Sequence, residues 1–212
     1  LSANSFTRTG YTFAGWSESI GGAVAYTDKQ SVKNLTTAHN TTVNLYAIWT
    51  ANTYSVSFDA NGGTVSPTSQ TKRFDSAYGK AADGTTTAAL PTPTRMGYTF
   101  GGWYAFSDYS GSKITDATVV ATASNHTLFA KWTAHTYTVQ YFANGGAGTM
   151  VSSVHTYDAA KTLTANAFTR TGYTFAGWAT SATGSVVYNN AESVKNLSAT
   201  DGATIELYAI WT

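Results

Sequence analysis

Few residues of this sequence could carry out chemistry, and they do not recur as a set. Asp59 could begin a calcium-binding loop in Asp-Ala-Asn-Gly-Gly, but Phe142 takes its place before a second Asn-Gly-Gly turn. No nucleophile elbow and no phosphate-binding loop followed by Lys occurs. No two of the four histidines stand at a metal-ligand spacing with a carboxylate: His39, His126, His135 and His155. We therefore expect no catalytic residue, no metal, no cofactor and no enzyme activity.

Cationic residues recur at two places, and each place allows two interpretations. Arg8, Arg95 and Arg170 stand two residues before a Gly-Tyr pair. They could contact anionic surface polymers, but we favour packing of each side chain over a neighbouring aromatic ring. Lys33 and Lys195 occur in two copies of Ser-Val-Lys-Asn-Leu. They could join an Asn side chain in an isopeptide bond, and a solvated Lys is the simpler interpretation.

The charge and composition exclude several classes of partner. The 212 residues contain 12 Lys and Arg against 11 Asp and Glu, without a basic run, so no nucleic-acid binding is expected. No apolar run reaches the roughly 18 to 20 residues of a membrane-spanning helix, so we expect no membrane insertion in this segment. The chain has no Cys and is rich in Thr, Ser and Asn, which favours an extracellular bacterial protein.

Aromatic residues recur much more regularly than ionisable ones. Gly-Tyr-Thr-Phe-Ala-Gly-Trp occurs at 10–16 and 172–178, and Gly-Tyr-Thr-Phe-Gly-Gly-Trp at 97–103. A second run, Leu-Tyr/Phe-Ala-x-Trp-Thr, ends at residues 50, 133 and 212. We predict a structural signature formed by the aromatic residues of the first run and the Trp of the second: Tyr11, Phe13, Trp16, Trp49, Tyr98, Phe100, Trp103, Trp132, Tyr173, Phe175, Trp178 and Trp211.

These runs divide the chain into three modules of about 80 residues when complete. Residues 51–133 and 134–212 are two complete repeat modules, here repeat 2 and repeat 3, because each begins with a Tyr-x-Val segment and Asn-Gly-Gly. Residues 1–50, here repeat 1, are a partial module that lacks this first hairpin. Repeat 1 aligns without a gap on residues 163–212, whereas repeat 2 carries an insertion. The chain begins at Leu1 without Met, so we expect it to be a piece of a longer protein.

The hydrophobic pattern predicts strands in each complete repeat. Apolar residues alternate in 53–58 and 136–141, and Asn-Gly-Gly then favours a hairpin turn. The Gly-Tyr-Thr-Phe run predicts a third strand with Phe13 and Trp16 on opposite faces, and the last run predicts a fourth strand. The only helical signal is weak and lies at 77–82 and 158–165. The resulting expectation is a strand-dominated α+β fold of tandem β-grasp-like modules.

The motifs resemble those of the internalin B-repeat family, also called Listeria-Bacteroides repeats. The resemblance rests on Tyr-x-Val-x-Phe-x-x-Asn-Gly-Gly, Thr-Arg-x-Gly-Tyr-Thr-Phe-x-Gly-Trp and Leu-Tyr-Ala-x-Trp-Thr, in that order. It covers essentially the whole chain. It implies a β-grasp-like fold, a bacterial cell-surface or secreted location, and a role as a stalk or spacer in adhesins. Residues 3–8 and 165–170 lack the prolines that 90–95 share with many members of the family.

Two functions therefore stay open at the level of sequence. The first is a non-catalytic stalk whose partners are neighbouring modules of the same chain. Connections of four residues between modules, without Gly or Pro, would then give an elongated, semi-rigid rod. The alternative is direct binding of host protein through a sheet edge, or of surface glycan through exposed aromatic rings. Burial of the signature tryptophans would favour the first function.

Overall fold

The computed structural model describes all 212 residues and contains twelve strands and no helix. The predicted predominance of strands is confirmed, but the α+β prediction is wrong, and the β-grasp-like module with its short helix is wrong with it. Residues 77–82 instead make backbone bridges to Val119 and Thr87. Residues 158–165 contain the short strand β9, Lys161–Thr162. Segments this short cannot offset the cost of helix nucleation without tertiary packing, and here their backbone pairs with other segments.

No segment has the helical length and apolarity needed to cross a membrane.

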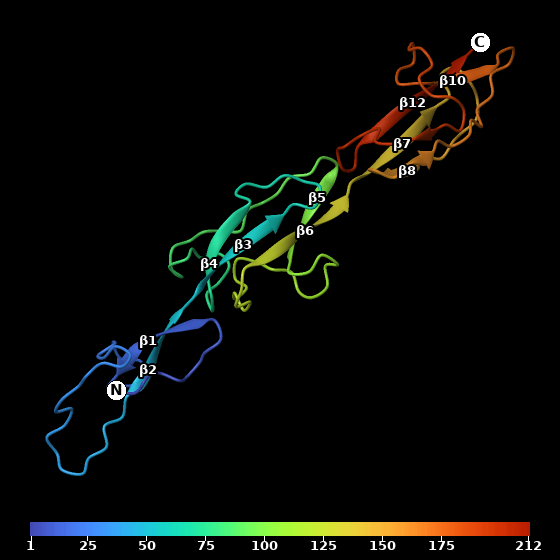
Figure 1. Cartoon of the computed structure of the whole chain (residues 1–212). Helices are drawn as coiled ribbons and strands as arrows, with labels where there is room; N and C mark the ends of the chain where they lie inside the picture. The colour runs from blue at the N-terminus through green and yellow to red at the C-terminus, as the bar shows by residue number, and fades with distance from the viewer. The chain divides into compact units, whose positions relative to one another are not determined.

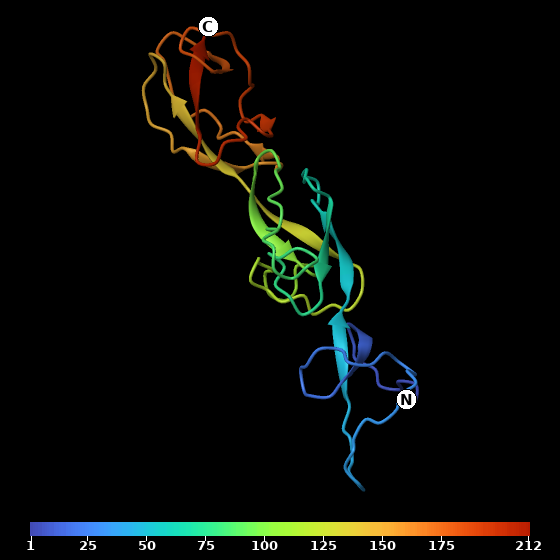
Figure 2. The same cartoon turned by 90° about the vertical axis from the view of Figure 1, so that its left-hand side faces the viewer.

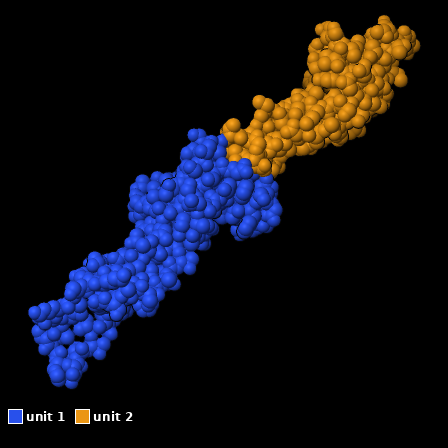
Figure 3. All heavy atoms as spheres, viewed as in Figure 1, with its two compact units in different colours: residues 1–59, 65–92, 102–130 blue, residues 60–64, 93–101, 131–212 orange.

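The residues cluster into two compact units, which are coloured separately in Figure 3. Repeat 1 lies in unit 1, repeat 3 lies in unit 2, and repeat 2 contributes residues to both. The units contain these ranges: 1–59, 65–92 and 102–130 in unit 1, and 60–64, 93–101 and 131–212 in unit 2.

Repeat 1 contains two antiparallel strands, β1 (Tyr11–Ser17) and β2 (Tyr46–Ala51), labelled in Figure 1. A β-bulge between Phe13 and Gly15 shifts their register. The bulge brings the rings of Phe13 and Trp16 to a centroid distance of 5.1 Å. The prediction that these two side chains lie on opposite faces is therefore wrong, because strict alternation is lost at the bulge.

Repeat 2 contains a four-stranded sheet in the order β4-β3-β6-β5. The hairpin strands pair antiparallel, while the first strand of the repeat pairs parallel with the last. The predicted hairpin around Asn-Gly-Gly is thus present, with residues 60–68 between its two strands. The strands are β3 (Thr53–Asp59), β4 (Ser69–Arg73), β5 (Tyr98–Tyr104) and β6 (His126–Ala134).

Repeat 3 has the same arrangement, in the order β10-β12-β7-β8, with an additional pair of two-residue strands. The first and last strands, β7 and β12, again pair parallel and lie side by side in both views (Figure 1, Figure 2). A bulge between Phe175 and Gly177 matches the one in repeat 1. The strands are β7 (Thr136–Phe142), β8 (Ser153–Thr156), β10 (Phe175–Ala179), β11 (Ser193–Val194) and β12 (Thr204–Trp211).

The core of repeat 3 lies over one face of this sheet and is mostly aromatic and aliphatic. Its centre is Trp178, which is fully buried and whose ring centroid lies 5.0 Å from that of Tyr141. Large aromatic side chains supply much apolar area to a small domain whose surface is large for its volume. The buried cluster consists of Tyr137, Val139, Tyr141, Leu163, Phe168, Trp178, Val194, Leu207 and Ala209.

Candidate functional site

The first Trp of the signature is a core residue in both complete repeats. Trp103 is 2% exposed and Trp178 is fully buried. The indole N–H of Trp103 donates to the carbonyl of Pro91 at 2.9 Å, whereas the indole N–H of Trp178 is buried without an acceptor. Trp16, the counterpart in repeat 1, is only partly buried. Neither Trp103 nor Trp178 is therefore displayed as a flat platform on which a sugar ring could stack.

The second Trp of the signature closes the Asn-Gly-Gly turn. The indole N–H of Trp132 donates to the carbonyl of Ala60, and that of Trp211 donates to the carbonyl of Ala143, both at 2.9 Å. These carbonyls lie just before the turns, so each Trp ties the last strand of its repeat to the end of the first. Trp49, the counterpart in repeat 1, is partly buried.

The signature Phe lies between these tryptophans. The ring of Phe175 has centroid distances of 4.9 Å to Trp178 and 5.8 Å to Trp211. Phe13 lies in the same way 5.6 Å from Trp49, and Phe100 lies 5.5 Å from Trp132. Edge-to-face and tilted pairs of this kind add to the stabilisation that burial provides. In repeats 1 and 3 the signature Phe and both Trp residues therefore form one packed group, since Phe13 also lies 5.1 Å from Trp16.

Each recurring Arg stacks on the signature Tyr three residues later. The guanidinium carbon lies 3.8 Å from the ring centroid in Arg8–Tyr11, 3.9 Å in Arg95–Tyr98 and 4.0 Å in Arg170–Tyr173. These contacts agree with the packing interpretation of the arginines. Arg95 also donates to the carbonyl of Asn61 at 3.0 Å. Cation–π stacking fixes the plane of each Tyr ring and holds its hydroxyl at the end of the repeat.

The contacts of Tyr11 form a joint between repeat 1 and repeat 2, here joint 1. The Tyr11 hydroxyl donates to the carboxylate of Asp75 at 2.6 Å, and its ring meets Phe74 edge-on at 5.6 Å. The backbone N–H of Asn52 donates to the Gly10 carbonyl at 2.9 Å, and the Asn52 carbonyl accepts from the N–H of Phe74 at 2.8 Å. All of these residues belong to unit 1.

The same contacts recur between repeats 2 and 3, here joint 2. The Tyr98 hydroxyl donates to the carboxylate of Asp158 at 2.9 Å, and its ring meets Tyr157 edge-on at 5.8 Å. His135 replaces Asn52: its N–H donates to the carbonyl of Gly97, and its carbonyl accepts from the N–H of Tyr157, both at 2.8 Å. Joint 2 lies entirely within unit 2.

Glycine is required at both joints because an aromatic ring covers it. Gly10 has φ of 78° and Gly97 has φ of 75°, and a Cβ atom on either would overlap the ring of Phe74 or Tyr157. The corresponding Gly172 has open space around it, and Tyr173 is 51% exposed. The signature Tyr therefore makes contacts between repeats at two of its three positions.

Electrostatics at the joints follows from these hydrogen bonds. The bond to Asp75 raises the pKa of Tyr11, and desolvation together with the bond to Asp158 raises the pKa of Tyr98. Hydrogen bonds from Asn196 and Tyr98 lower the pKa of Asp158. Asp158 is therefore a carboxylate that accepts these hydrogen bonds at neutral pH.

Sequence reasoning missed Asp75 and Asp158, although a signal for them exists. Both follow an aromatic residue directly after the return strand, in Phe74-Asp75 and Tyr157-Asp158. Both have positive φ of 61°, which is unusual for a residue other than Gly. The two aromatic-Asp pairs could have been aligned between the repeats, but nothing in one repeat alone indicates their partner in the repeat before.

Two buried ionisable residues also occupy equivalent places and were not predicted. Lys72 pairs with Tyr54 across the hairpin of repeat 2, and His155 pairs with Tyr137 in repeat 3. Lys72 is fully buried and its ammonium group donates to the carbonyls of Lys80 at 3.1 Å and Ala88 at 2.6 Å. Desolvation lowers its pKa.

His155 is 1% exposed and stacks on the ring of Tyr137 at a centroid distance of 5.5 Å. Its Nε2 lies 2.9 Å from the hydroxyl oxygen of Ser153, and its Nδ1 is buried without a partner. Desolvation, with a smaller contribution from Lys161, lowers the pKa of His155. This His is a neutral core residue rather than a member of a reactive pair.

The remaining residues of possible chemical use are dispersed. No group of three His, Asp or Glu residues could hold a metal ion. His126 lies 2.7 Å from the Tyr78 hydroxyl, and Asp59 is an exposed residue at the end of β3. Lys195 pairs with Asp158 at 3.5 Å and stays 52% exposed. His39 is exposed.

Comparisons with known proteins agree with the recurrence of the signature. A family model described as the Listeria-Bacteroides repeat domain matches residues 1–48, 54–131 and 137–210. Internalin H of Listeria monocytogenes is 33% identical over 130 residues, which cover 60% of this chain and 20% of that protein. No solved structure matches the chain.

Two further relatives come from Evansella cellulosilytica and are provisionally described as membrane proteins, one of them Gly-rich. They are 33% and 31% identical over 144 residues, or 66% of this chain. The chain spans only 20% and 16% of their lengths. The three segments matched by the family model include nine of the twelve signature residues. The other three, Trp49, Trp132 and Trp211, each lie one position beyond the end of a match. The chain belongs to the Listeria-Bacteroides repeat family.

Proposed function

We propose that this chain is a non-catalytic spacer in a bacterial surface-associated or secreted protein, where it separates other parts of that protein. The observation that carries the proposal is the recurrence of one joint: Tyr11 with Asp75, and Tyr98 with Asp158. Module contacts that repeat with the same backbone bonds, the same edge-on ring and the same carboxylate support a fixed geometry from one repeat to the next. Binding of a ligand by one repeat does not by itself require such contacts.

The placement of the aromatic residues further supports a spacer over a glycan-binding module. Trp103 and Trp178 are buried, and Trp132 and Trp211 use their N–H groups inside the repeat. Sugar recognition through stacking requires exposed rings with free polar edges. The relation to Internalin H, and to two relatives described as membrane proteins, supports a surface-associated location for the parent protein.

Small-angle X-ray scattering of the full chain tests the spacer. A spacer should give a radius of gyration well above the value of about 17 Å that is expected for a compact globule of this length. The double variant Tyr98→Phe with Asp158→Ala should broaden the distribution of distances. A radius near the compact value for the unaltered chain would contradict the proposal.

A further inference from the structure

The first and last strands of each complete repeat lie side by side and run in the same direction. In repeat 2, β3 pairs parallel with β6 over four residue pairs, beginning with Val56 and His126. In repeat 3, β7 pairs parallel with β12 over five residue pairs, beginning with Thr138 and Thr204. The chain therefore enters a complete repeat on one strand of a parallel pair and leaves it on the other.

These strands also follow one another along the chain with little interruption. A single residue, Asn52, separates β2 from β3, and a single residue, His135, separates β6 from β7. Tension along the chain therefore passes from one repeat to the next through these strands. As long as the parallel pair of a repeat holds, the hairpin turn, the return strand and the loops between its two strands bear no load.

The parallel direction decides how tension acts on each pair. It pulls the first strand backward from its start and the last strand forward from its end, so the two strands are driven to slide past each other. The hydrogen bonds of a parallel ladder are evenly spaced along both strands, so sliding loads all of them together. Two strands pulled apart at one end would instead lose the same bonds one after another.

Side-chain hydrogen bonds tie both ends of the pair in repeat 2. At the start of the ladder, the N–H of Ser55 donates to the side-chain oxygen of Asn125 at 2.9 Å. At its end, the indole N–H of Trp132 donates to the carbonyl of Ala60 at 2.9 Å. Both bonds join the first strand or its turn to the last strand or the residue before it, so they resist opening from either end.

The pair in repeat 3 is tied at the same two places. Before the ladder, the N–H of Gly202 donates to the carbonyl of Thr136 at 2.7 Å. After it, the indole N–H of Trp211 donates to the carbonyl of Ala143 at 2.9 Å. The arrangement is therefore common to both complete repeats, although the bonds at the start of the ladder come from different groups.

Buried side chains cover one face of both ladders. Val56 and Leu128 are fully buried in repeat 2, as are Val139 and Leu207 in repeat 3. Hydrogen bonds shielded from water are stronger than those exposed to it. Sliding would also pull these packed side chains apart, so packing and hydrogen bonding resist the same movement.

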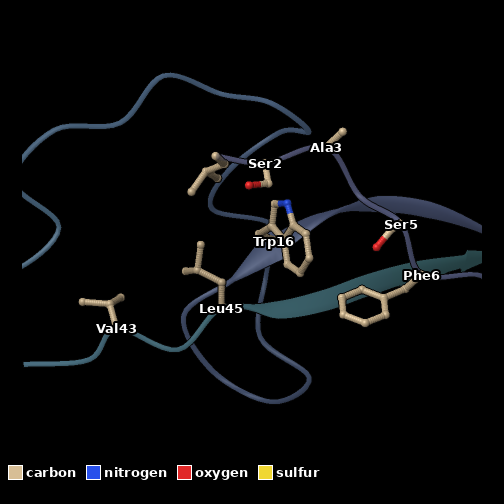
Figure 4. Close-up of a pocket in the computed structure, with 8 residues that line it drawn as sticks. Ser2, Ala3, Ser5, Phe6, Trp16, Val43 and Leu45 are labelled. Carbon is tan, nitrogen blue, oxygen red and sulfur yellow. The ribbon is translucent and has the colours of Figure 1, made fainter.

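Repeat 1 has a different arrangement in this chain. Residues 1–50 contain strands of one antiparallel sheet, β1 with β2, and an open pocket of about 390 Å³ beside Trp16 (Figure 4). Val43 and Leu45, which precede β2, line that pocket. The inference therefore concerns repeats 2 and 3.

We propose that the parallel pair of first and last strands is a mechanical clamp, which keeps repeats 2 and 3 folded while the chain is under tension. The proposal rests on the proposed spacer function, because a segment that separates two parts of a surface protein transmits the forces between them. The insertion of repeat 2 lies between β4 and β5, outside the clamp. The clamp thus allows the intervening segments to vary without changing the strands that bear the load.

Single-molecule force measurements on the full chain test the clamp of repeat 2. The chain has no Cys, so two introduced Cys residues define where the load acts. Thr53→Cys with Thr133→Cys places the attachments at opposite ends of the β3–β6 pair and loads the pair by sliding. Thr53→Cys with Ser124→Cys places both attachments at the same end and peels the pair open. All three positions are exposed.

Forced unfolding is governed by the rate of unfolding, so the readout is the lifetime of folded repeat 2 at constant force. We expect this lifetime to be longer by about tenfold or more under sliding than under peeling at the same force. Equal lifetimes, or a shorter lifetime under sliding, would overturn the inference.

Two further variants separate the clamp from the rest of repeat 2. Trp132→Phe removes the hydrogen bond to Ala60 and should shorten the lifetime under sliding by about two- to tenfold. Asp83→Ala removes the hydrogen bonds from Thr85 and Thr86, between β4 and β5, and should leave that lifetime unchanged. An effect of Asp83→Ala as large as that of Trp132→Phe would contradict a load confined to the clamp.

Scattering of the full chain distinguishes failure of the clamp from failure of the spacer. A radius of gyration well above the compact value, together with equal lifetimes under sliding and peeling, would overturn the clamp and leave the spacer standing. A radius near the compact value, together with a longer lifetime under sliding, would contradict the spacer and support the clamp as a property of the repeat.

Discussion

Repeats 2 and 3 place the same signature Trp in the same core but surround it with different polar groups. In repeat 2 the Pro91 carbonyl, from the insertion, accepts the hydrogen bond of Trp103, whereas repeat 3 has no such segment and leaves Trp178 without an acceptor. Lys72 in repeat 2, with two carbonyl acceptors, occupies the place of His155 in repeat 3. The comparison indicates that the aromatic packing defines the fold. The buried polar groups differ between the repeats, and their hydrogen bonds are arranged differently in each.

The largest expected effect is loss of the buried indole. Trp178→Ala and Trp103→Ala should each reduce the stability of their own repeat by about 3–5 kcal/mol, because a large cavity replaces the packed ring. Trp16→Ala should cost less, since Trp16 is only partly buried. Hydrogen exchange resolved by repeat measures each local opening energy. Retention of full protection in repeat 3 of Trp178→Ala would refute its role in the core.

The next effect concerns the glycine before each of these tryptophans. Gly177 has φ of 150°, and a Cβ atom there would overlap Val186 and approach the Tyr188 carbonyl to 2.8 Å. At Gly102 the Cβ would meet only the flexible side chain of Lys113. Gly177→Ala should therefore cost about 2–4 kcal/mol and Gly102→Ala about 1–2 kcal/mol. Urea denaturation of both variants would measure this, and the reverse order would contradict the packing described for the bulge.

Conservative replacement of the indole isolates its hydrogen bond. Trp103→Phe leaves the Pro91 carbonyl without its donor, while Trp178→Phe removes an N–H that had no acceptor. Both lose a similar ring volume, so Trp103→Phe should be more destabilising by about 1–2 kcal/mol. Paired denaturation experiments measure the difference. Equal costs would show that the acceptor in repeat 2 contributes nothing.

Acid should destabilise repeat 3 through His155. Its pKa in the folded chain lies below the ordinary value of 6.5, so the unfolded chain binds the proton first as pH falls through that value. Stability is therefore lost below about pH 6.5, with a slope of at most about 1.4 kcal/mol per pH unit for one group. Exchange of repeat 3 amides at pH 7 and pH 5 tests this.

His155→Phe is the matched control, since it keeps a ring over Tyr137 and cannot be protonated. Its repeat 3 should lose less stability on acidification than that of the unaltered chain. Lys72, which occupies the equivalent place in repeat 2, should affect stability at alkaline rather than acidic pH. Its pKa is lowered from 10.5, so repeat 2 should gain stability as pH rises toward that value. If the unaltered chain and His155→Phe lost the same stability of repeat 3 on acidification, His155 would not be the source of the acid sensitivity.

The smallest effects belong to the joints. Tyr11→Phe and Tyr98→Phe remove only a hydroxyl from exposed hydrogen bonds, so each should cost about 0.5–1 kcal/mol in exchange protection around its joint. Tyr173→Phe is the control, because Tyr173 lies at no joint, and it should cost nothing measurable. A loss at Tyr173 equal to that at Tyr98 would remove the distinction between joint and free positions.

Much of the fold was predictable from the sequence because it depends on local alternation and on recurrence. The hairpins at Asn61-Gly62 and Asn144-Gly145 and the packing of Arg on Tyr follow from short patterns. The bulge at Gly15 does not follow from such a pattern. It changes the side of the strand to which the following side chains point, so strict alternation gives the wrong face for Trp16. The absent helix at 158–165 was decided by tertiary pairing of Lys161 and Leu163, which local propensity cannot reveal.

The joints were predictable only in part. Short connections indicated that successive repeats touch, but the partner of Tyr98 is Asp158, 60 residues later. Hydrophobic periodicity reports only on neighbouring residues, so it cannot predict a pair at such a separation. The buried Lys72 was hidden for a related reason: its acceptors are backbone carbonyls, which carry no sequence signature.

Residual dipolar couplings across joint 2 test the central claim most directly. If the joint fixes successive repeats, amides of residues 93–101 and of repeat 3 should fit one alignment tensor, and Tyr98→Phe with Asp158→Ala should reduce the agreement. Two unrelated tensors in the unaltered chain would show that the repeats move independently, and would contradict the account of the chain as a spacer.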